Sequence, residues 1–378
     1  MKLLIVSDYF YPHWTGISKS ILYLAQAIED KIDTTVLTVR YDAALKKKEK
    51  MGKVVVIRKN YQFKLSRACY SFLVVVELWR LVRQMDVVLI NSPCANILPV
   101  SLITKLFGKK LTIFHQGDLV LPQGILNRVI EMMFNLASYI SFFLADKLAT
   151  YTQDYLDHSR LLPRFAHKAQ AVLIPLPYFQ KNNQTKVGCK KIKQQLRRIK
   201  GDRFLIGFAG RFAQEKGFDV LLKAIIELTQ QRDDLQFVFA GATQLDYENF
   251  FEKNHLLIEA SQHNLTFLGL LNDHELLSFY QSLDLFILPS RTECFGLVQA
   301  ESMAAGVPVV VANTPGAREV VRQTGFGLVF ESEDVDDLSQ KIVKALNKLP
   351  TFQKHYPKVE KYFDYERSRQ KTRQLVVK

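Results

Sequence analysis

The chain has 378 residues, 48% of them hydrophobic and 23% charged, which excludes a disordered or fibrous protein and predicts two domains of ordinary size. Its net charge of +14 is uneven, because residues 1–175 carry +10, residues 176–200 carry +8 and residues 201–378 carry −4. The basic first half favours an anionic partner, namely nucleic acid, a lipid surface or a phosphorylated substrate; the alternative is a solvated basic face without a particular partner.

Strands and helices are predicted to alternate in the first half of the chain. Apolar runs predict strands at 2–8, 34–40, 53–59, 86–92, 110–118, 147–153 and 171–177. Helical patterns occupy 18–30, 70–85, 97–108 and 125–146. Within the last of these, 129–147 comes nearest to the ~20 apolar residues of a membrane span, but Glu131 and Asn135 interrupt it. We interpret it as a core helix; the alternative is that one of its faces meets a membrane.

The second half repeats this rhythm. Strands are predicted at 204–210, 235–241, 265–271, 285–290, 307–313 and 325–330, and helices at 217–231, 272–284, 297–306, 334–349 and 365–378. Strands separated by helices predict parallel, doubly wound sheets. We therefore expect an α/β protein with two Rossmann-like domains that face each other across a cleft, where ligands sit beyond the carboxyl ends of the strands.

The predicted domain boundaries follow the prolines and the charge. An N-terminal domain is expected at 1–177, a basic connector at 178–200 and a C-terminal domain at 201–356, with a helix at 357–378 that packs back toward the N-terminal domain. The four cysteines form no C-x-x-C pair and indicate neither a zinc site nor a disulfide framework, which favours a reducing cytoplasm: Cys69, Cys94, Cys189 and Cys294.

The loop "GRFAQEKG" follows a predicted strand and leads into a helix. It begins at Gly210 and contains Arg211 and Lys216, two cations beside a helix N-terminus. Such a loop suits a diphosphate, because arginine grips two oxygens and lysine adds a point charge. The alternative is a pair of solvated surface charges.

The stretch "PSRTECFGLVQAESMAAGVPVV" places two carboxylates around a helix start. Glu293 precedes the helix expected to begin near Gly296 or Leu297, and Glu301 lies about 6 Å along its axis. The two carboxylates are acceptors at both ends of a site, and the free N–H groups between them are donors in the middle. A nucleoside diphosphate sugar needs this order, because it has hydroxyls at both ends and charge in the middle. A buried Glu301 needs hydrogen-bond partners; the alternative is that it pairs with a structural cation.

These two motifs, with "TPGAREVV" and "GFGLVF" after them, resemble the E-x7-E type retaining glycosyltransferases of family four, also called group 1 glycosyl transferases. The resemblance covers about residues 203–350, and it implies the GT-B fold. The first half is similar mainly in pattern, through "YPHWTG" and "HQGDL".

The resemblance implies roles for the matching positions of the second half. Glu301 would accept hydrogen bonds from ribose hydroxyls, and Glu293 would contact hydroxyls of the transferred sugar. Arg211 and Lys216 would neutralise the departing diphosphate, with Gly210 at the start of their loop. Backbone donors to sugar or phosphate would come from three consecutive residues: Phe295, Gly296 and Leu297.

Four further positions follow from the same resemblance. Gly16 would let the N-terminal loop approach the phosphate, although Ile17 stands where relatives often have a second glycine. His115 would lie at the reaction centre near the sugar. The loop of Leu270 would hold the base, and Cys294 occupies a position where glycine is frequent.

We therefore predict a cytoplasmic, metal-independent, retaining glycosyltransferase of cell-envelope polysaccharide or glycolipid synthesis. Its donor would be a UDP- or GDP-sugar, which is a substrate, so no cofactor is expected. Its acceptor would be a hydroxyl of a glycan or a lipid-linked sugar. Residues 334–336 mimic the D-x-D of metal-using transferases, but acids at a helix start favour a cap, and no metal site is predicted.

The basic charge of the N-terminal domain does not decide whether the domain binds a membrane. Residues 60–84 mix cations with aromatic side chains, which suits either the inner face of the cytoplasmic membrane or a helix packed on the sheet with its cations in water. No nucleic acid is expected. The rival functions are a sugar-nucleotide epimerase or hydrolase on the same fold and a basic RNA-binding module, although no aromatic RNA-recognition motif is present.

Overall fold

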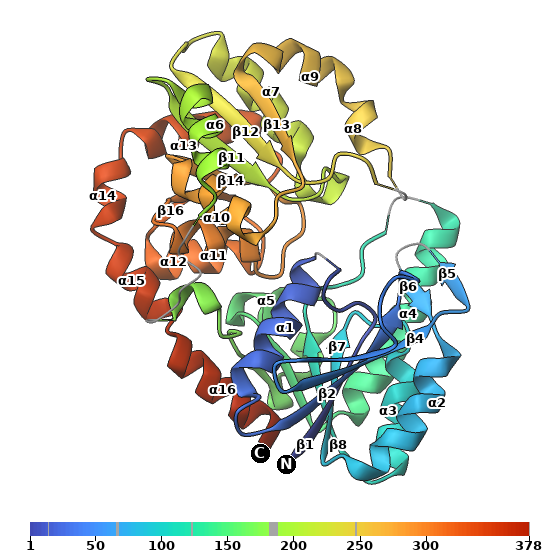
Figure 1. Ribbon diagram of the computed structural model, residues 1–378. Helices are drawn as coiled ribbons and strands as arrows, with labels where there is room; N and C mark the ends of the chain where they lie inside the picture. Colours follow the sequence, from blue (N-terminus) through green and yellow to red (C-terminus); the bar gives the residue numbers. More distant parts are fainter. Residues whose placement is uncertain (14, 66–67, 122–123, 181–187, 246–247, 378) are drawn as a thin grey trace. The chain divides into compact units, whose positions relative to one another are not determined.

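The computed structural model describes residues 1–13, 15–65, 68–121, 124–180, 188–245 and 248–377 (Figure 1). The chain divides into two compact units, which we call unit 1 (Met1–Leu176 with Tyr365–Lys378) and unit 2 (Pro177–Asp364). Each unit has its own parallel sheet with helices packed on it, which confirms the predicted α/β class with two Rossmann-like domains. The predicted cleft stays a prediction.

Unit 1 is built on an eight-stranded sheet in the order β10-β9-β8-β7-β1-β2-β4-β3, in which β3 pairs antiparallel with β4. The buried strand β1 lies between β2 and β7, so the strand order reverses there. A separate hairpin pairs β5 with β6. The strands are β1 (Lys2–Ser7), β2 (Asp33–Arg40), β3 (Lys48–Met51), β4 (Val54–Asn60), β5 (Phe63–Leu65), β6 (Ala68–Tyr70), β7 (Val87–Ser92), β8 (Lys110–His115), β9 (Lys147–Thr150) and β10 (Ala169–Ala171).

The helices of unit 1 include the C-terminal one, α16, which contacts α1. Asp30, just after α1, pairs with Arg369 at 2.8 Å and with Arg373 at 2.6 Å. The helical segments are α1 (Gly16–Ile28), α2 (Phe72–Leu81), η1 (Val82–Gln84), α3 (Ile97–Leu106), α4 (Ile125–Leu144), α5 (Gln153–His158), η2 (Leu162–Lys168) and α16 (Tyr365–Val377).

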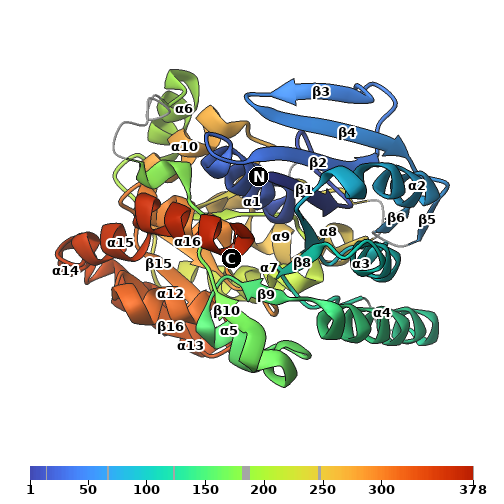
Figure 2. The same ribbon diagram turned by 90° about the horizontal axis from the view of Figure 1, so that it is seen from below.

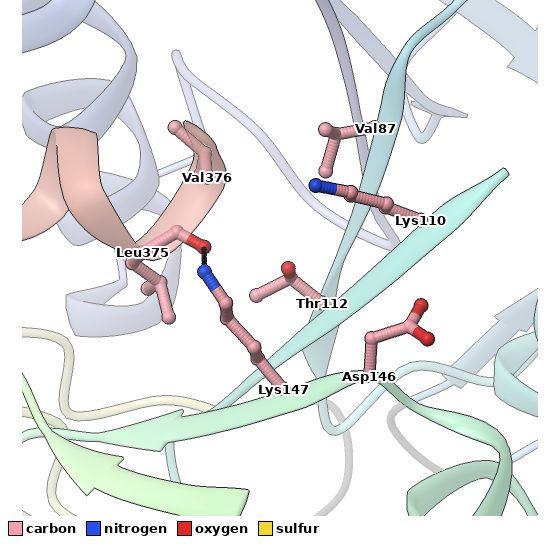
Figure 3. Close-up of a pocket in the computed structure, with 7 residues that line it drawn as sticks. All are labelled: Val87, Lys110, Thr112, Asp146, Lys147, Leu375 and Val376. Atoms are coloured by element: carbon pink, nitrogen blue, oxygen red, sulfur yellow. Dashed lines mark hydrogen bonds between the residues drawn. The ribbon is translucent and has the colours of Figure 1, made fainter. Parts of the chain in front are cut away.

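A small cavity of about 160 Å³ lies where α16 meets the sheet (Figure 3). Lys147 donates from Nζ to the carbonyl oxygens of Gln374 and Leu375 at 3.1 and 3.2 Å, so it satisfies the last carbonyls of α16. Val87, Lys110 and Lys147, which line the cavity, are the first residues of β7, β8 and β9. Ligands of open α/β sheets bind at the opposite edge, so this cavity serves the attachment of α16.

The prediction that 129–147 is a core helix is wrong. Helix α4 buries only Ser138, Ser141 and Phe142, and most of its other large apolar side chains face solvent. The exposed side chains of α4 are Ile125, Leu126, Val129, Met132, Met133, Leu136, Tyr139 and Phe143. The periodicity was that of an amphipathic helix, but near its C-terminal end the helix turns Ser138, Ser141 and Phe142 toward the protein, while its apolar stripe faces solvent. No helix in the described ranges combines the length and the apolar character needed to cross a membrane.

Unit 2 has a six-stranded, fully parallel sheet in the order β13-β12-β11-β14-β15-β16. Here the order reverses at β11, which lies between β12 and β14. The strands are β11 (Phe204–Ala209), β12 (Leu235–Ala240), β13 (Leu265–Gly269), β14 (Leu285–Leu288), β15 (Val309–Ala312) and β16 (Gly327–Phe330).

The helical segments of unit 2 begin before the predicted domain start at 201. Helix α6 lies in the predicted connector; it packs on α10, burying Ile192 and Leu196. Asp334 caps α13 by accepting from the N–H of Asp337, as predicted for a helix start. The segments are η3 (Pro177–Phe179), α6 (Lys190–Lys200), η5 (Gln214–Lys216), α7 (Phe218–Thr229), α8 (Phe250–Lys253), α9 (His255–Ser261), η6 (Gln262–Asn264), α10 (Asp273–Ser282), α11 (Leu297–Ala304), α12 (Ala317–Thr324), α13 (Val335–Leu346), α14 (Leu349–Gln353) and α15 (Tyr356–Tyr362).

Candidate functional site

Two loops of unit 2 meet at the point where the strand order reverses. Strands β11 and β14 are neighbours, with Ile206 opposite Leu285, and their carboxyl ends open into loops 210–217 and 289–296. Open α/β sheets bind ligands at such a point. Leu297 begins α11 directly after the second loop. Most of the residues of unit 2 that were predicted to bind the nucleotide sugar lie in the two loops: Gly210, Arg211, Lys216, Glu293, Cys294, Phe295 and Gly296.

Loop 210–217 is anchored by aromatic packing on one side and by a glycine on the other. Phe212 packs against Phe218 and Phe267, with ring centroids 4.5 and 5.7 Å apart. Gly217 has a φ of +66°, and a Cβ there would lie 2.0 Å from the carbonyl oxygen of Pro289. The two loops therefore touch at a position that only glycine fits.

The structure pairs two residues whose roles were predicted separately. Lys216 Nζ lies 2.8 Å from Glu293 Oε2, and the two side chains are 22% and 11% exposed. Burial acts to lower the pKa of Lys216, but the carboxylates of Glu293 and Glu215 outweigh it and raise that pKa. Lys216 therefore keeps its charge.

Arg211 also has a carboxylate partner in the same loop. Its Nη2 lies 2.8 Å from Glu215 Oε1, and its side chain is 35% exposed. Arg211 is thus a partly exposed cation held by a carboxylate of its own loop. Arg211 and Lys216 with their acids form a charge cluster at the loop tip, where they can exchange carboxylate oxygens for those of a phosphate.

Arg291 is a positioning residue that the sequence reasoning missed. It donates to both carboxylate oxygens of Asp219 at 2.8 Å, to Glu333 at 2.7 Å and to the carbonyl of Gln214 at 2.7 Å. The hydrogen bonds that Arg291 donates to Asp219 raise the pKa of Arg291. Arg291 thereby ties loop 289–296 to the start of α7. An arginine just after a buried strand was the available signal.

The turn before α11 is held in place by a glycine and by buried neighbours. Gly296 has a φ of +74° and precedes the helix, which begins at Leu297. Phe295 is 2% exposed and packs against Phe363, with ring centroids 6.2 Å apart. A Cβ on Gly316 would lie 2.2 Å from the carbonyl oxygen of Cys294, so a second loop supports this turn. The first amides of α11 thus sit at a fixed position.

Glu301 is buried and hydrogen-bonded, as a carboxylate within an apolar helix must be. Tyr178 donates to Oε1 at 3.1 Å and Tyr280 donates to Oε2 at 3.0 Å. These two hydroxyls are neutral hydrogen-bond partners, one on each carboxylate oxygen. Neither tyrosine carried a sequence signal.

Leu270 lies outside this cluster. It follows β13, its side chain is 75% exposed, and it sits after Gly269, whose φ is +70°. An exposed loop beyond a strand end is compatible with base binding through backbone groups, and this assignment stays a prediction.

Unit 1 has its own cluster at the carboxyl ends of its strands. His115, the last residue of β8, is 1% exposed, and its ring nitrogens lie 3.1 Å from Ser92 Oγ and 3.2 Å from Asp118 Oδ1. Burial acts to raise the pKa of Asp118, but His115 and Arg160 outweigh it and lower that pKa. The imidazole is therefore fixed by protein groups on both sides. Gly16 begins α1 on the same unit.

Asp8 is a further buried acid that the sequence reasoning missed. It directly follows β1, accepts from the N–H of Ala95 at 2.7 Å, and lies 3.2 Å from the thiol of Cys94. Burial raises its pKa to about 6, against the lowering effect of the Ala95 amide. Its signal was an acid at the end of a buried strand.

Residues 190–361 match the family model for glycosyl transferases group 1. A capsular polysaccharide biosynthesis glycosyltransferase, CapM of Staphylococcus aureus, is 27% identical over 157 residues, 42% of this chain and 40% of that protein. A GDP-mannose-dependent monoacylated α-(1-6)-phosphatidylinositol monomannoside mannosyltransferase of Corynebacterium glutamicum is 33% identical over 150 residues, 38% of each. The matched part thus spans about two fifths of these curated relatives.

The fold of the whole chain is similar to that of solved glycosyltransferase structures. Anabaena Alr3699/HepE in complex with UDP superposes with a TM-score of 0.76 over 99% of each chain, at 16% identity. At that identity the likeness shows the fold, which is the GT-B fold. The second half of this chain is therefore similar, over residues 190–361, to the glycosyl transferases group 1 family.

Proposed function

We propose that this protein is a retaining, metal-independent glycosyltransferase that moves a sugar from a nucleotide diphosphate to a hydroxyl of a glycan or lipid-linked acceptor. The observation that carries the proposal is the charge cluster of unit 2, in which Lys216 and Glu293 lie 2.8 Å apart beside the start of α11. One loop offers cations, the helix offers amides, and buried Glu301 offers an acceptor for hydroxyls.

The cluster suits the charges that develop when the sugar–phosphate bond breaks. Negative charge grows on the departing diphosphate, and Lys216, Arg211 and the amides at the α11 start can stabilise it, an effect of several kcal/mol in comparable sites. Because Lys216 already carries its charge in the free protein, little reorganisation is needed. These cations supply the role that a metal ion has in other transferases.

Glu293 is not assigned as a covalent nucleophile. Its carboxylate is neutralised by Lys216 at 2.8 Å, which weakens it as a nucleophile. We assign it to hydroxyls of the transferred sugar instead. Retention of configuration would then come from front-face attack, in which the leaving phosphate helps to remove the proton of the acceptor hydroxyl.

The acceptor is assigned to unit 1. His115 and Asp8 lie at the carboxyl ends of its strands, where doubly wound sheets bind ligands. The relatives named above act, by their names, in capsular polysaccharide synthesis and on a phosphatidylinositol mannoside, which supports a glycan or glycolipid acceptor. All four cysteines are free thiols, which supports a cytoplasmic location.

A donor screen followed by a transfer assay tests the proposal. UDP, GDP, ADP and their sugars are first ranked by thermal shift, because a ligand that binds the native state raises the melting temperature. The best donor is then incubated with and without glycan and glycolipid acceptors. We expect transfer that needs an acceptor and keeps the anomeric configuration. Fast donor consumption without acceptor would identify a hydrolase or epimerase instead.

Variants connect the activity to the cluster. Lys216→Ala and Glu301→Ala should each lower transfer at least 100-fold while the protein stays folded, as judged by circular dichroism. Lys223→Ala is the matched control, because Lys223 is an exposed lysine of the neighbouring α7. Full activity of either site variant would overturn the roles assigned here.

A further inference from the structure

Helix α4 exposes its apolar stripe to solvent, whereas a surface helix of a globular domain usually buries that stripe. Its buried residues are Ser138, Ser141 and Phe142, while its exposed side carries the eight large apolar residues given above. Ile125 is 85% exposed and Phe143, five turns along, is 69% exposed. The exposed positions recur every three or four residues, so they form one stripe along the whole helix.

Two neighbouring helices widen this stripe into a surface. Helix α3 contacts both α2 and α4, and the three lie side by side in Figure 2. The exposed apolar residues they add are Phe72, Leu73, Val76 and Trp79 on α2, and Leu102 and Leu106 on α3. We call the exposed apolar side chains of α2, α3 and α4 the apolar face.

The size of the apolar face calls for a partner. Its side chains expose on the order of 1,000 Å² of apolar surface, whereas monomeric proteins rarely expose more than a few hundred Å² in one patch. A surface spread over three helices is also wider than the seam that two paired helices bury.

Cations surround the apolar face and lie over its aromatic rings. Lys168 Nζ lies 5.9 Å from the ring centre of Phe143, and the guanidinium of Arg164 lies 6.0 Å from that of Tyr139. Long basic side chains and aromatic rings at the rim of an apolar surface are typical of a protein that sits at a bilayer interface.

A groove of about 430 Å³ joins this face to a basic wall. Leu73 and Val76 line it from α2, and Lys47, Lys48 and Lys59 line it from the β3–β4 side. Its lining includes one acid, Glu77, which pairs with Lys59 at 2.8 Å, and five cationic residues. Arg58 among them is buried and pairs with Glu49 at 2.6 Å, so Lys47, Lys48, Lys59 and Arg80 form the accessible basic wall. An apolar wall against a cationic wall matches a lipid, whose acyl chain and phosphate headgroup present the same two chemistries.

We propose that the apolar face of α2, α3 and α4 docks unit 1 on an anionic bilayer, with a phosphate headgroup in the adjoining basic groove. The charge favours this occupant over a second copy of the chain. A symmetric dimer through this face would bring the same cations against each other, which is unfavourable. The inference does not depend on the proposed enzymatic function, because it concerns a surface rather than a reaction.

Vesicle binding tests the docking directly. The full chain is mixed with vesicles of phosphatidylcholine containing about 30% phosphatidylglycerol, and with pure phosphatidylcholine vesicles as the neutral arm. We expect co-sedimentation with the anionic vesicles that weakens as NaCl rises from about 0.05 to 0.5 M. Brominated acyl chains should quench tryptophan fluorescence, and the quenching should vanish in Trp79→Phe. No binding to anionic vesicles would overturn the proposal.

Matched variants assign the binding to the surface. Met133→Gln/Leu136→Gln and Lys47→Ser/Lys48→Ser should each weaken vesicle binding at least tenfold, with melting temperatures unchanged because the altered side chains are exposed. Leu256→Gln, an exposed leucine of α9 in unit 2, is the apolar control, and Lys190→Ser/Lys191→Ser in basic α6 is the charge control.

Three results would contradict the docking surface. Equal binding by the surface variants and the wild type is one, and loss of binding in either control is another. The third is a stable dimer in sedimentation velocity without lipid that Met133→Gln/Leu136→Gln dissociates, since the face would then belong to a second copy. Vesicle binding with an inactive transferase would leave the docking intact and count only against the proposed function.

Discussion

The ion pair between Lys216 and Glu293 gives the sharpest prediction about unit 2. Lys216→Met removes the cation and keeps most of the side chain's length, which leaves a Glu293 carboxylate that is 11% exposed without its partner. Two unit charges 2.8 Å apart attract each other by about 6 kcal/mol at an effective dielectric constant of about 20. The cost of burying both charges offsets most of this, so we expect a coupling energy of about 1–3 kcal/mol.

A double-mutant cycle of Lys216→Met, Glu293→Gln and their combination measures that coupling. Hydrogen exchange of peptides from 204–217 and 285–301 reports the opening free energy of the two loops, independently of unit 1. Both single variants should lose protection, and the double variant should lose less than their sum. Lys223→Met on α7 should change nothing. Effects that add to within about 0.5 kcal/mol would refute the coupling.

Three further substitutions test other parts of the structure. Burial raises the pKa of Asp8 from 3.8 to about 6, so its stabilising contribution is present below pH 3.8 and lost as pH rises through 6. Asp8→Asn should therefore raise the free energy of unfolding at pH 8 by up to about 3 kcal/mol and leave it unchanged at about pH 3 in urea titrations; a pH-independent difference would contradict this. Gly217→Ala should lower the stability of unit 2 by at least about 2 kcal/mol in calorimetry, because its φ is +66° and its Cβ would meet Pro289; an unchanged melting profile would exclude that clash. Tyr280→Phe should raise KM for the donor more than it lowers kcat, because it removes one hydrogen bond that orients Glu301; an unaltered KM would count against this role.

The order of strands and helices was largely accessible from the sequence. Buried strands such as β1 and β11 are short apolar runs bounded by polar loops, and that pattern depends on neighbours along the chain. The same locality placed Gly296 at a helix start and Asp334 at a cap. Motifs within one loop were therefore predictable.

Contacts across the chain were not accessible in the same way. Lys216 and Glu293 are 77 residues apart, and Tyr178 and Glu301 are 123 apart, so no local pattern links either pair. The misassigned α4 shows a second limit. Its periodicity marks an apolar side but does not identify the surface that this side contacts. An apolar stripe has the same spacing whether it packs on a sheet of its own domain or on an external apolar surface.

The grip of unit 2 on a diphosphate is the central claim, and calorimetric titration tests it most directly. The preferred diphosphate among UDP, GDP and ADP, and its nucleoside, are titrated into the wild type, Lys216→Met and Glu293→Gln. A lost charge-assisted hydrogen bond is worth about 1.5–3 kcal/mol, so Lys216→Met should weaken the diphosphate at least tenfold and leave the nucleoside unchanged. Glu293→Gln should keep diphosphate affinity. Equal weakening of the nucleoside, or unchanged diphosphate binding by Lys216→Met, would contradict the account.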